Sequence, residues 1–101
     1  MRFALMTEPQ LGGTYAQLAA AARQAEQVGF ETFARSDHFY WTGDEAAPAT
    51  EAFATLGGLA RETNRIRLTV LVSPLTFRHP AVIAKAAATL DQMSEGRFDL
   101  G

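Results

Sequence analysis

The hydrophobic positions of this chain alternate between short continuous runs and stretches with helical spacing. Apolar runs at residues 2–7, 66–72 and 97–100, and a weaker one at 32–35, predict buried strands. Between the runs, apolar residues recur every three or four positions, which is typical of a helix that packs one face against a sheet. The expected core positions are Leu18, Ala21, Ala22, Ala25 and Val28, then Phe53, Leu56, Leu59 and Ala60, then Ile83, Ala86, Ala87, Leu90 and Met93.

Residues that begin and end helices flank these three stretches. Thr14 and Gln17 have the spacing of a capping box, so the first helix is expected to begin there. Thr50 is the expected cap of the second helix, and Pro80 suits the first turn of the third. The expected stops are Gly29, Asn64 and Gly96.

Strand and helix therefore alternate, which predicts an α/β fold with parallel strands joined by right-handed crossovers. The strand centres are separated by steps of roughly 30, 35 and 30 residues, close to the ~31 residues of each unit in a (β/α)₈ barrel. We expect the first three to three-and-a-half βα units of a TIM barrel. A small doubly wound domain has similar spacing and stays open as an alternative, although residues 7–13 lack the glycine fingerprint of a dinucleotide-binding turn.

Composition narrows the class of protein further. The 101 residues include no cysteine, which excludes disulfides and cysteine-ligated metals, and nine basic against eleven acidic residues predict no nucleic-acid partner. No apolar run approaches the ~18 residues needed to cross a bilayer, and Glu8 and Pro9 interrupt the apolar start too early for a signal peptide. We expect a cytoplasmic protein without a membrane or nucleic-acid partner, and a chain too short to hold a complete barrel.

The loop expected at residues 36–49 carries the strongest candidate chemistry. It opens with Ser36, Asp37 and His38, followed by three aromatic residues that end at Trp41. His38 could exchange protons near neutral pH with Asp37 as its partner, and the aromatic residues could cover a planar ligand. The alternative is a turn capped by Asp37 with a surface histidine.

A second candidate loop follows the third strand. Ser73 and Thr76 could donate hydrogen bonds to a ligand, and Arg78 could bind an anion near the start of the third helix. The structural alternative, which we favour here, is a turn in which Thr76 or His79 caps that helix. Glu8 in the first loop is expected to serve a turn, as is Gln10. His38 and His79 do not have metal-ligand spacing, so no metal site is predicted.

Some segments of the chain, taken together and in order, resemble a known family. They are residues 1–7 (MRFALMT), 25–30 (AEQVGF), 35–39 (RSDHF), 76–80 (TFRHP) and 90–101 (LDQMSEGRFDLG). The last is similar to the signature D-x-x-S-x-G-R-x-x-L-G of the bacterial luciferase-like family of flavin- and deazaflavin-dependent oxidoreductases. The resemblance covers residues 1–101 as the N-terminal part of that family's TIM barrel.

The resemblance implies an oxidoreductase or monooxygenase that binds the deazaflavin coenzyme F420, with FMN as the alternative. His38 would be the catalytic proton donor or acceptor during hydride transfer. In the matching deazaflavin enzymes an aspartate contacts the ring, an aromatic residue lines the pocket and a non-proline cis peptide bond lies behind the ring, here near Leu71–Val72. The implied cofactor-binding residues are therefore Asp37, Trp41, Leu71, Val72 and Ser73.

Two functional hypotheses follow. The first is an enzyme, or a piece of one, that moves hydride to or from a small organic substrate or inserts one oxygen atom into it. The second is a noncatalytic, truncated barrel fragment that associates with a partner chain, because a parallel sheet that ends at its fourth strand has an open edge. In either case we expect a homo-oligomer or self-association through that open edge.

Overall fold

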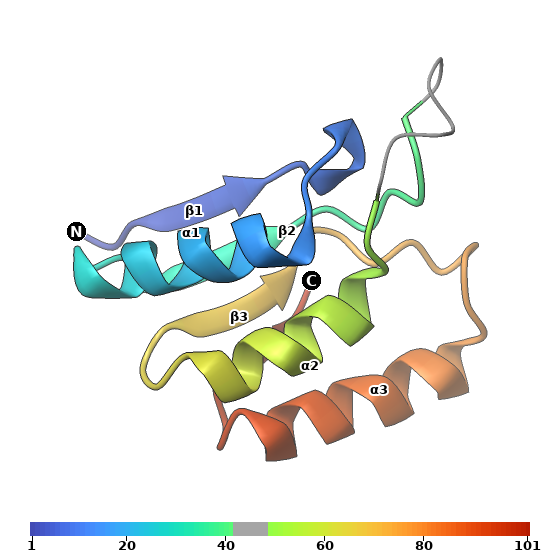
Figure 1. Ribbon diagram of the computed structural model, residues 1–101. Coiled ribbons are helices and arrows are strands. Elements are labelled where there is room, and N and C mark those ends of the chain that lie inside the picture. Colours follow the sequence, from blue (N-terminus) through green and yellow to red (C-terminus); the bar gives the residue numbers. More distant parts are fainter. Residues whose placement is uncertain (42–48) are drawn as a thin grey trace.

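Strands and helices alternate along the chain in the computed structural model, which describes residues 1–41 and 49–101 (Figure 1). The strands are β1 (Ala4–Thr7), β2 (Thr32–Arg35), β3 (Arg67–Val70) and β4 (Phe98–Leu100). The helices are α1 (Tyr15–Gln27), α2 (Ala52–Glu62) and α3 (Pro80–Met93), and a short 3-10 helix, η1 (Pro9–Leu11), follows β1. All the predicted strands are present. β2 has the predicted bounds, and the other strands are shorter than the predicted apolar runs.

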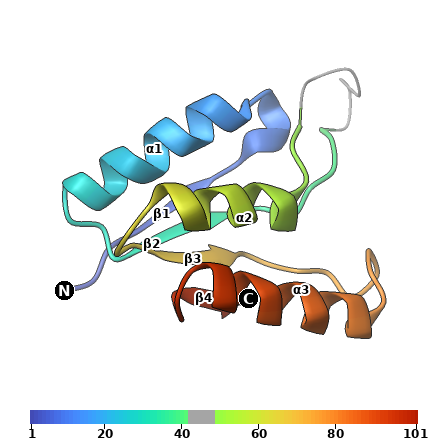
Figure 2. The ribbon, with the colours of Figure 1, turned by 60° about the horizontal axis from the view of Figure 1, so that its bottom comes forward.

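The strands form one parallel sheet in the order β1-β2-β3-β4. Leu5 is in register with Phe33, Phe33 with Leu68, and Leu68 with Phe98, so one row of large apolar side chains crosses the sheet. Figures 1 and 2 show α1, α2 and α3 on the same side of this sheet. A doubly wound fold has helices on both faces. The prediction of successive units of a (β/α) barrel is therefore confirmed, and the doubly wound alternative is wrong.

The core lies between the sheet and the helices. Phe33, Leu56, Leu59 and Leu68 have no exposed surface, and three alanines of α1 are buried in the same core. The predicted core positions are buried or packed against the core except Val28, which is 61% exposed. Val28 caps the C-terminus of α1, so it stands one residue beyond the helical face that the spacing describes.

The helix boundaries follow the local chemistry of the sequence. Thr14 and Gln17 form the predicted capping box, and Gly29 has the positive φ (94°) that suits a residue just beyond a helix end. Pro80 begins α3 as predicted, and the His79 imidazole caps it, since Nδ1 accepts the backbone N–H of Ala81 at 3.2 Å. His79 thus has the structural role that the sequence favoured.

The predicted cap at the start of α2 is wrong. The cap is Glu51, whose carboxylate accepts the backbone N–H of Ala54 at 2.7 Å, and not Thr50. The Thr50 hydroxyl accepts a hydrogen bond from Arg35 instead. At the other end, the helix ends at Glu62 with Thr63 as its cap, so the expected stop at Asn64 directly follows the cap, as Gly29 does after α1.

Arg97 of the signature segment holds the C-terminal end of α2. Its guanidinium donates to the carbonyl oxygens of Ala60 (2.8 Å), Thr63 (3.1 Å), Ile66 (2.8 Å) and Ser94 (2.7 Å), and to the Thr63 hydroxyl (3.0 Å). The last carbonyls of a helix have no partner within it, and a cation there also complements the helix dipole. The arginine of the signature therefore has a structural function in this chain.

Glu26 binds free backbone N–H groups at the start of β3, as Arg97 binds free carbonyl groups at the end of α2. Its carboxylate accepts the backbone N–H groups of Asn64, Arg65 and Ile66, at 3.0, 2.6 and 2.7 Å. Burial alone would raise the pKa of Glu26, but these hydrogen bonds outweigh burial and lower it. The negative charge of Glu26 thus stabilises the turn that leads into β3. None of the described helices is long and apolar enough to cross a membrane.

Candidate functional site

The candidate site lies at the carboxyl ends of the strands, where the loops after β1, β2 and β3 meet. Backbone hydrogen bonds hold the first residues of these loops in register: Ser36 N–H donates to Thr7 O (3.1 Å) and Leu71 N–H to Arg35 O (2.9 Å). The Asp37–His38 segment and the Ser73–Pro74 segment therefore open on the same edge of a parallel sheet. This is the edge at which α/β barrels and sheets bind ligands.

Arg35 supports this edge from below and has no exposed surface. Its guanidinium donates to Ser36 O, Thr50 Oγ1, Thr50 O, Glu51 O and Thr55 Oγ1, at distances from 2.8 to 3.4 Å. Burial lowers the pKa of Arg35, although the nearby carboxylates of Glu51 and Asp37 oppose this. The sequence analysis missed this residue as a part of the site. The available signal was a charged residue at the end of a strand that is otherwise uncharged.

The Asp37 carboxylate is bound by Arg78 from the loop before α3. Nη1 of Arg78 contacts Oδ2 of Asp37 and Nη2 donates to Oδ1 at 2.9 Å, while Nη2 also contacts Glu51. The side chain of Asp37 is 1% exposed and that of Arg78 is 13% exposed. The hydrogen bonds that Arg78 donates to the Asp37 carboxylate raise the pKa of Arg78, an effect that burial opposes. Two carboxylates thus occupy the Arg78 guanidinium, which agrees with the structural alternative favoured from the sequence over an anion site.

The aromatic residues of the second loop remain largely exposed. Phe39 packs on Phe77 with ring centroids 4.9 Å apart, which joins the loop after β2 to the loop after β3. His38 lies at the exposed rim beside the buried Asp37, and Trp41 is 50% exposed. The rest of the predicted aromatic loop, residues 42–48, lies outside the described residues.

The segment after β3 presents an apolar surface with one polar atom behind it. Leu71 and Val72 are 50% and 59% exposed, and the peptide bond between them is cis, as the family resemblance implied. The Ser73 hydroxyl is buried and has no hydrogen-bond partner among residues 1–41 and 49–101. A buried hydroxyl without a partner is uncommon in folded proteins, so this atom is a candidate ligand contact.

The first loop is fixed by a buried glutamine. The Ser36 hydroxyl donates to Oε1 of Gln10 at 2.7 Å, and the Gln10 amide contacts the carboxylate of Glu8. Gln10 is 2% exposed and Ser36 is 1% exposed. Gln10 therefore holds the turn after β1 against the start of the second loop, which agrees with the expected turn role.

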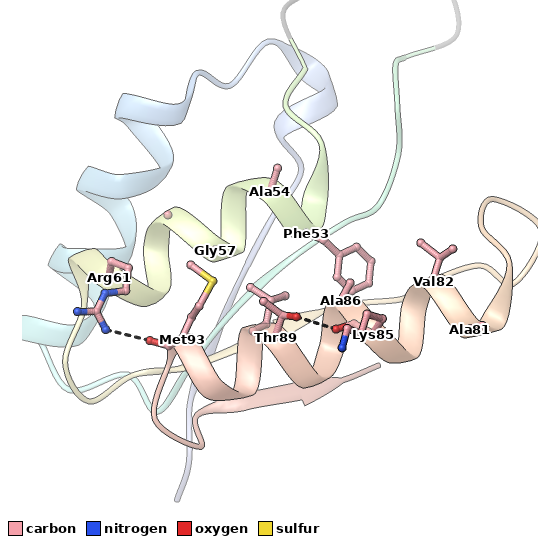
Figure 3. Close-up of a pocket in the computed structure, with 12 residues that line it drawn as sticks. Phe53, Ala54, Gly57, Arg61, Ala81, Val82, Lys85, Ala86, Thr89 and Met93 are labelled. Atoms are coloured by element: carbon pink, nitrogen blue, oxygen red, sulfur yellow. Dashed lines mark hydrogen bonds between the residues drawn. The ribbon is translucent and has the colours of Figure 1, made fainter.

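A separate groove lies between α2 and α3 (Figure 3). It has a volume of about 800 Å³, and residues of these two helices alone line it, among them Gly57, Val82 and Met93. It contains none of the candidate site residues. Within the described part of the chain, no group of three or more histidine or acidic side chains could hold a metal ion.

Comparisons with known proteins agree with the barrel architecture. The family model described as luciferase-like monooxygenase matches residues 1–101. This chain therefore belongs to the luciferase-like monooxygenase family, which is the family that the sequence resembles.

Named relatives include enzymes of two kinds. The chain is 40% identical over 85 residues to an F420-dependent glucose-6-phosphate dehydrogenase of Amycolatopsis mediterranei (strain U-32), covering 83% of this chain and 26% of that protein. It is 42% identical over 69 residues to the alkanal monooxygenase beta chain of Aliivibrio fischeri, covering 68% of this chain and 20% of that one. The chain thus spans about a quarter of the length of these relatives.

A solved structure shows the same arrangement. The coenzyme F420-dependent tetrahydromethanopterin reductase of Methanopyrus kandleri matches with a TM-score of 0.85 and 27% identity, over 99% of this chain and 26% of that one. The relatives named here are oxidoreductases or monooxygenases, and two of the three use F420.

Proposed function

We propose that this chain forms the N-terminal part of the cofactor site of an oxidoreductase that uses the deazaflavin coenzyme F420, with FMN as the alternative cofactor. The proposal is carried by the loops after β2 and β3, which bring His38 to the same edge as the exposed surface of Leu71 and Val72. The F420-dependent relatives support the choice of cofactor. The substrate is proposed only as a small organic molecule.

The residues at this edge fit a planar, largely apolar ring with polar margins. Leu71 and Val72 offer an apolar surface to one side of a ring, and Trp41 offers an aromatic one. The Ser73 hydroxyl lacks a partner and could donate a hydrogen bond to a polar atom of the ring. Asp37 belongs to the proposed set as well, with its carboxylate held by Arg78.

The bound cofactor would supply the hydride, and the protein would supply orientation and proton transfer. His38 is the residue proposed to hold or release a proton, since an imidazole nitrogen can accept or donate one and the side chain is exposed at the rim. The apolar surfaces around it would exclude water from the ring. Hydride transfer to a substrate and oxygen insertion are both compatible with these roles.

Titration of the purified chain with F420 and, separately, with FMN tests the proposal through the quenching of cofactor fluorescence. Saturable binding of F420 that is tighter than binding of FMN is the expected result. Tighter binding of FMN would reverse the choice of cofactor, and no binding of either would overturn the proposal.

A noncatalytic role in association is the second candidate function. Among residues 1–41 and 49–101, β1 and β4 each pair with a strand on one side only, and Met6 and Leu100 on these strands are 38% and 53% exposed. Unpaired strand edges favour pairing with another chain. Sedimentation velocity tests this candidate: a concentration-dependent dimer or larger species is expected, and a monomer at all concentrations would contradict it.

A further inference from the structure

We propose that Arg78 is a positioning residue of the site, which fixes the His38 loop by binding the Asp37 carboxylate. The inference rests on the proposed function and deepens it, because it specifies how the protein holds the loop that carries the proposed proton-transfer residue.

Three elements meet at the Arg78 guanidinium. Arg78 itself stands two residues before α3, Asp37 stands two residues after β2, and Glu51 is the cap of α2. The contact to Asp37 uses both carboxylate oxygens and both terminal nitrogens of the guanidinium, and the fork of two hydrogen bonds fixes distance and orientation together. A shift of the loop after β2 relative to the loop after β3 would break this contact between Asp37 and Arg78.

Burial makes this ion pair different from an ordinary surface pair. With side chains 1% and 13% exposed, Asp37 and Arg78 are shielded from water, whereas the pair formed by Arg67 and Asp99 is 37% and 51% exposed. Removing one partner of a buried pair leaves an uncompensated charge, which is far more costly than breaking an exposed pair. The surroundings of Asp37 therefore depend strongly on Arg78.

Aromatic contacts extend this effect to the rim. The guanidinium carbon of Arg78 lies 5.4 Å from the centre of the Phe39 ring and 4.9 Å from that of Phe53. Phe39 directly follows His38, and Phe77 directly precedes Arg78 and packs on Phe39. His38 is thus flanked in sequence by two residues that Arg78 contacts, and loss of Arg78 would release the histidine on both sides.

A side chain that merely stabilises the fold would behave differently from one that positions this loop. Trp41, which is the only tryptophan of the chain, lies on the same loop three positions after His38. Its emission and its quenching by acrylamide report the state of the loop without any cofactor. Arg97 provides the matched control, because it also makes many hydrogen bonds, but at the opposite ends of α2 and the sheet.

The experiment compares the unaltered chain with Arg78→Gln, Arg78→Lys, Asp37→Asn, the double variant Arg78→Gln/Asp37→Asn, and Arg97→Gln. Each is measured for thermal midpoint, Trp41 emission, acrylamide quenching and the Kd for F420 and FMN. All spectroscopic measurements are made well below the lowest thermal midpoint, so that every variant is folded.

Arg78→Gln is expected to increase the acrylamide quenching of Trp41 and to raise the cofactor Kd about tenfold. Arg78→Lys, which keeps the charge but loses the fork, should recover part of the loss. The double variant should bind no more weakly than Arg78→Gln, because coupled residues are not additive. Arg97→Gln should lower the thermal midpoint yet leave Trp41 and the Kd unchanged.

Equal effects of Arg78→Gln and Arg97→Gln on Trp41 would overturn the inference, since both would then act through stability alone. Additive effects of Arg78→Gln and Asp37→Asn on the Kd would overturn it as well, because the two side chains would then influence cofactor binding independently of each other. If the unaltered chain binds neither cofactor, the proposed function fails, and the Trp41 measurements still decide whether Arg78 positions the loop.

Discussion

The carboxylate of Glu26 accepts the backbone N–H of Ile66 at 2.7 Å, which ties the end of α1 to the start of β3. Ile66 has no exposed surface, so this hydrogen bond forms at the margin of the core. Glu26 belongs to the first βα unit, and Ile66 leads into the third. The contact therefore fixes the first unit relative to the third on the edge of the sheet opposite to the candidate site.

Replacing Glu26 with glutamine should lower the free energy of unfolding at pH 7 by about 1 kcal/mol, because a neutral amide accepts three backbone hydrogen bonds less strongly and water screens the part-exposed group. The folded pKa of Glu26 is lowered. Its stabilising effect is therefore complete above the unfolded value of about 4.3 and disappears as pH falls through the folded value. Urea unfolding at several pH values measures both.

The control for this change is Glu95→Gln, since Glu95 is exposed and its side chain makes no hydrogen bond or ion pair to a described residue, while its backbone N–H bond to Gln92 is unaffected by the change. The difference between Glu26→Gln and the unaltered chain should shrink as the pH falls below about 4. A difference that stays constant with pH would show that the charge of Glu26 is not the cause.

Replacing Gly57 or Gly58 of α2 with alanine should change the stability of the chain in opposite directions. A methyl group at Gly57 would meet the Met93 side chain at 3.5 Å, which is ordinary contact, so Gly57→Ala should stabilise the chain by about 0.5–1 kcal/mol through helix propensity. A methyl group at Gly58 would lie 2.8 Å from Cε2 of Tyr15 and displace that ring. The hydrogen bond from Tyr15 to Glu62 would then be lost.

Thermal midpoints of the two glycine variants, measured side by side, test this prediction. Because both replacements have the same intrinsic propensity, the difference isolates the contact with Tyr15. Equal stabilisation by both replacements would contradict the close packing of α1 on α2.

Ser73→Ala should weaken cofactor binding without lowering the stability of the chain. A buried hydroxyl without a partner costs free energy, so the alanine variant should be as stable as the unaltered chain or more stable by up to about 1 kcal/mol. If Ser73 donates a hydrogen bond to the cofactor, the same variant should bind it about tenfold more weakly. Thermal unfolding and cofactor titration measure the two effects, and unchanged affinity would remove Ser73 from the proposed site.

His38→Gln should abolish most turnover in a complete barrel that contains this segment, with little change in stability. His38 is exposed, so its replacement creates no cavity, and loss of a proton-transfer group reduces rates by about 10²–10⁴-fold. The rate of F420 oxidation or reduction, followed by absorbance, measures the effect. His79→Gln is the informative comparison, because it removes a helix cap and should affect stability more than turnover.

The order of elements could be predicted from the sequence because each one depends on local chemistry. The capping box at Thr14, the stop at Gly29 and the proline at the start of α3 are all signals within a few residues. Glu51 was missed because threonine is the commoner cap residue, whereas the Thr50 hydroxyl here accepts a hydrogen bond from Arg35, which is distant in sequence. A local pattern cannot show which of two neighbours has another partner.

The site was predictable in outline only. Parallel strands place their loops on one edge, so the proximity of the Asp37 and Ser73 loops followed from the predicted topology. The pairing of Asp37 with Arg78 did not, because it depends on side-chain directions in two loops. The two interpretations of Asp37, as a turn residue and as a cofactor contact, therefore could not be separated from the residue types alone.

The sequential order of the strands has a consequence for synthesis on the ribosome. Each strand pairs with the one made just before it, and no later segment has to insert between strands that are already paired. A nascent chain could therefore pack each new βα unit onto the units already folded as it emerges from the ribosome. The chain segments that must close into loops then stay short. The hydrogen bonds between Glu26 and Ile66 and between Arg97 and Ala60 would then form one after the other during translation, and each would hold a newly added segment in place.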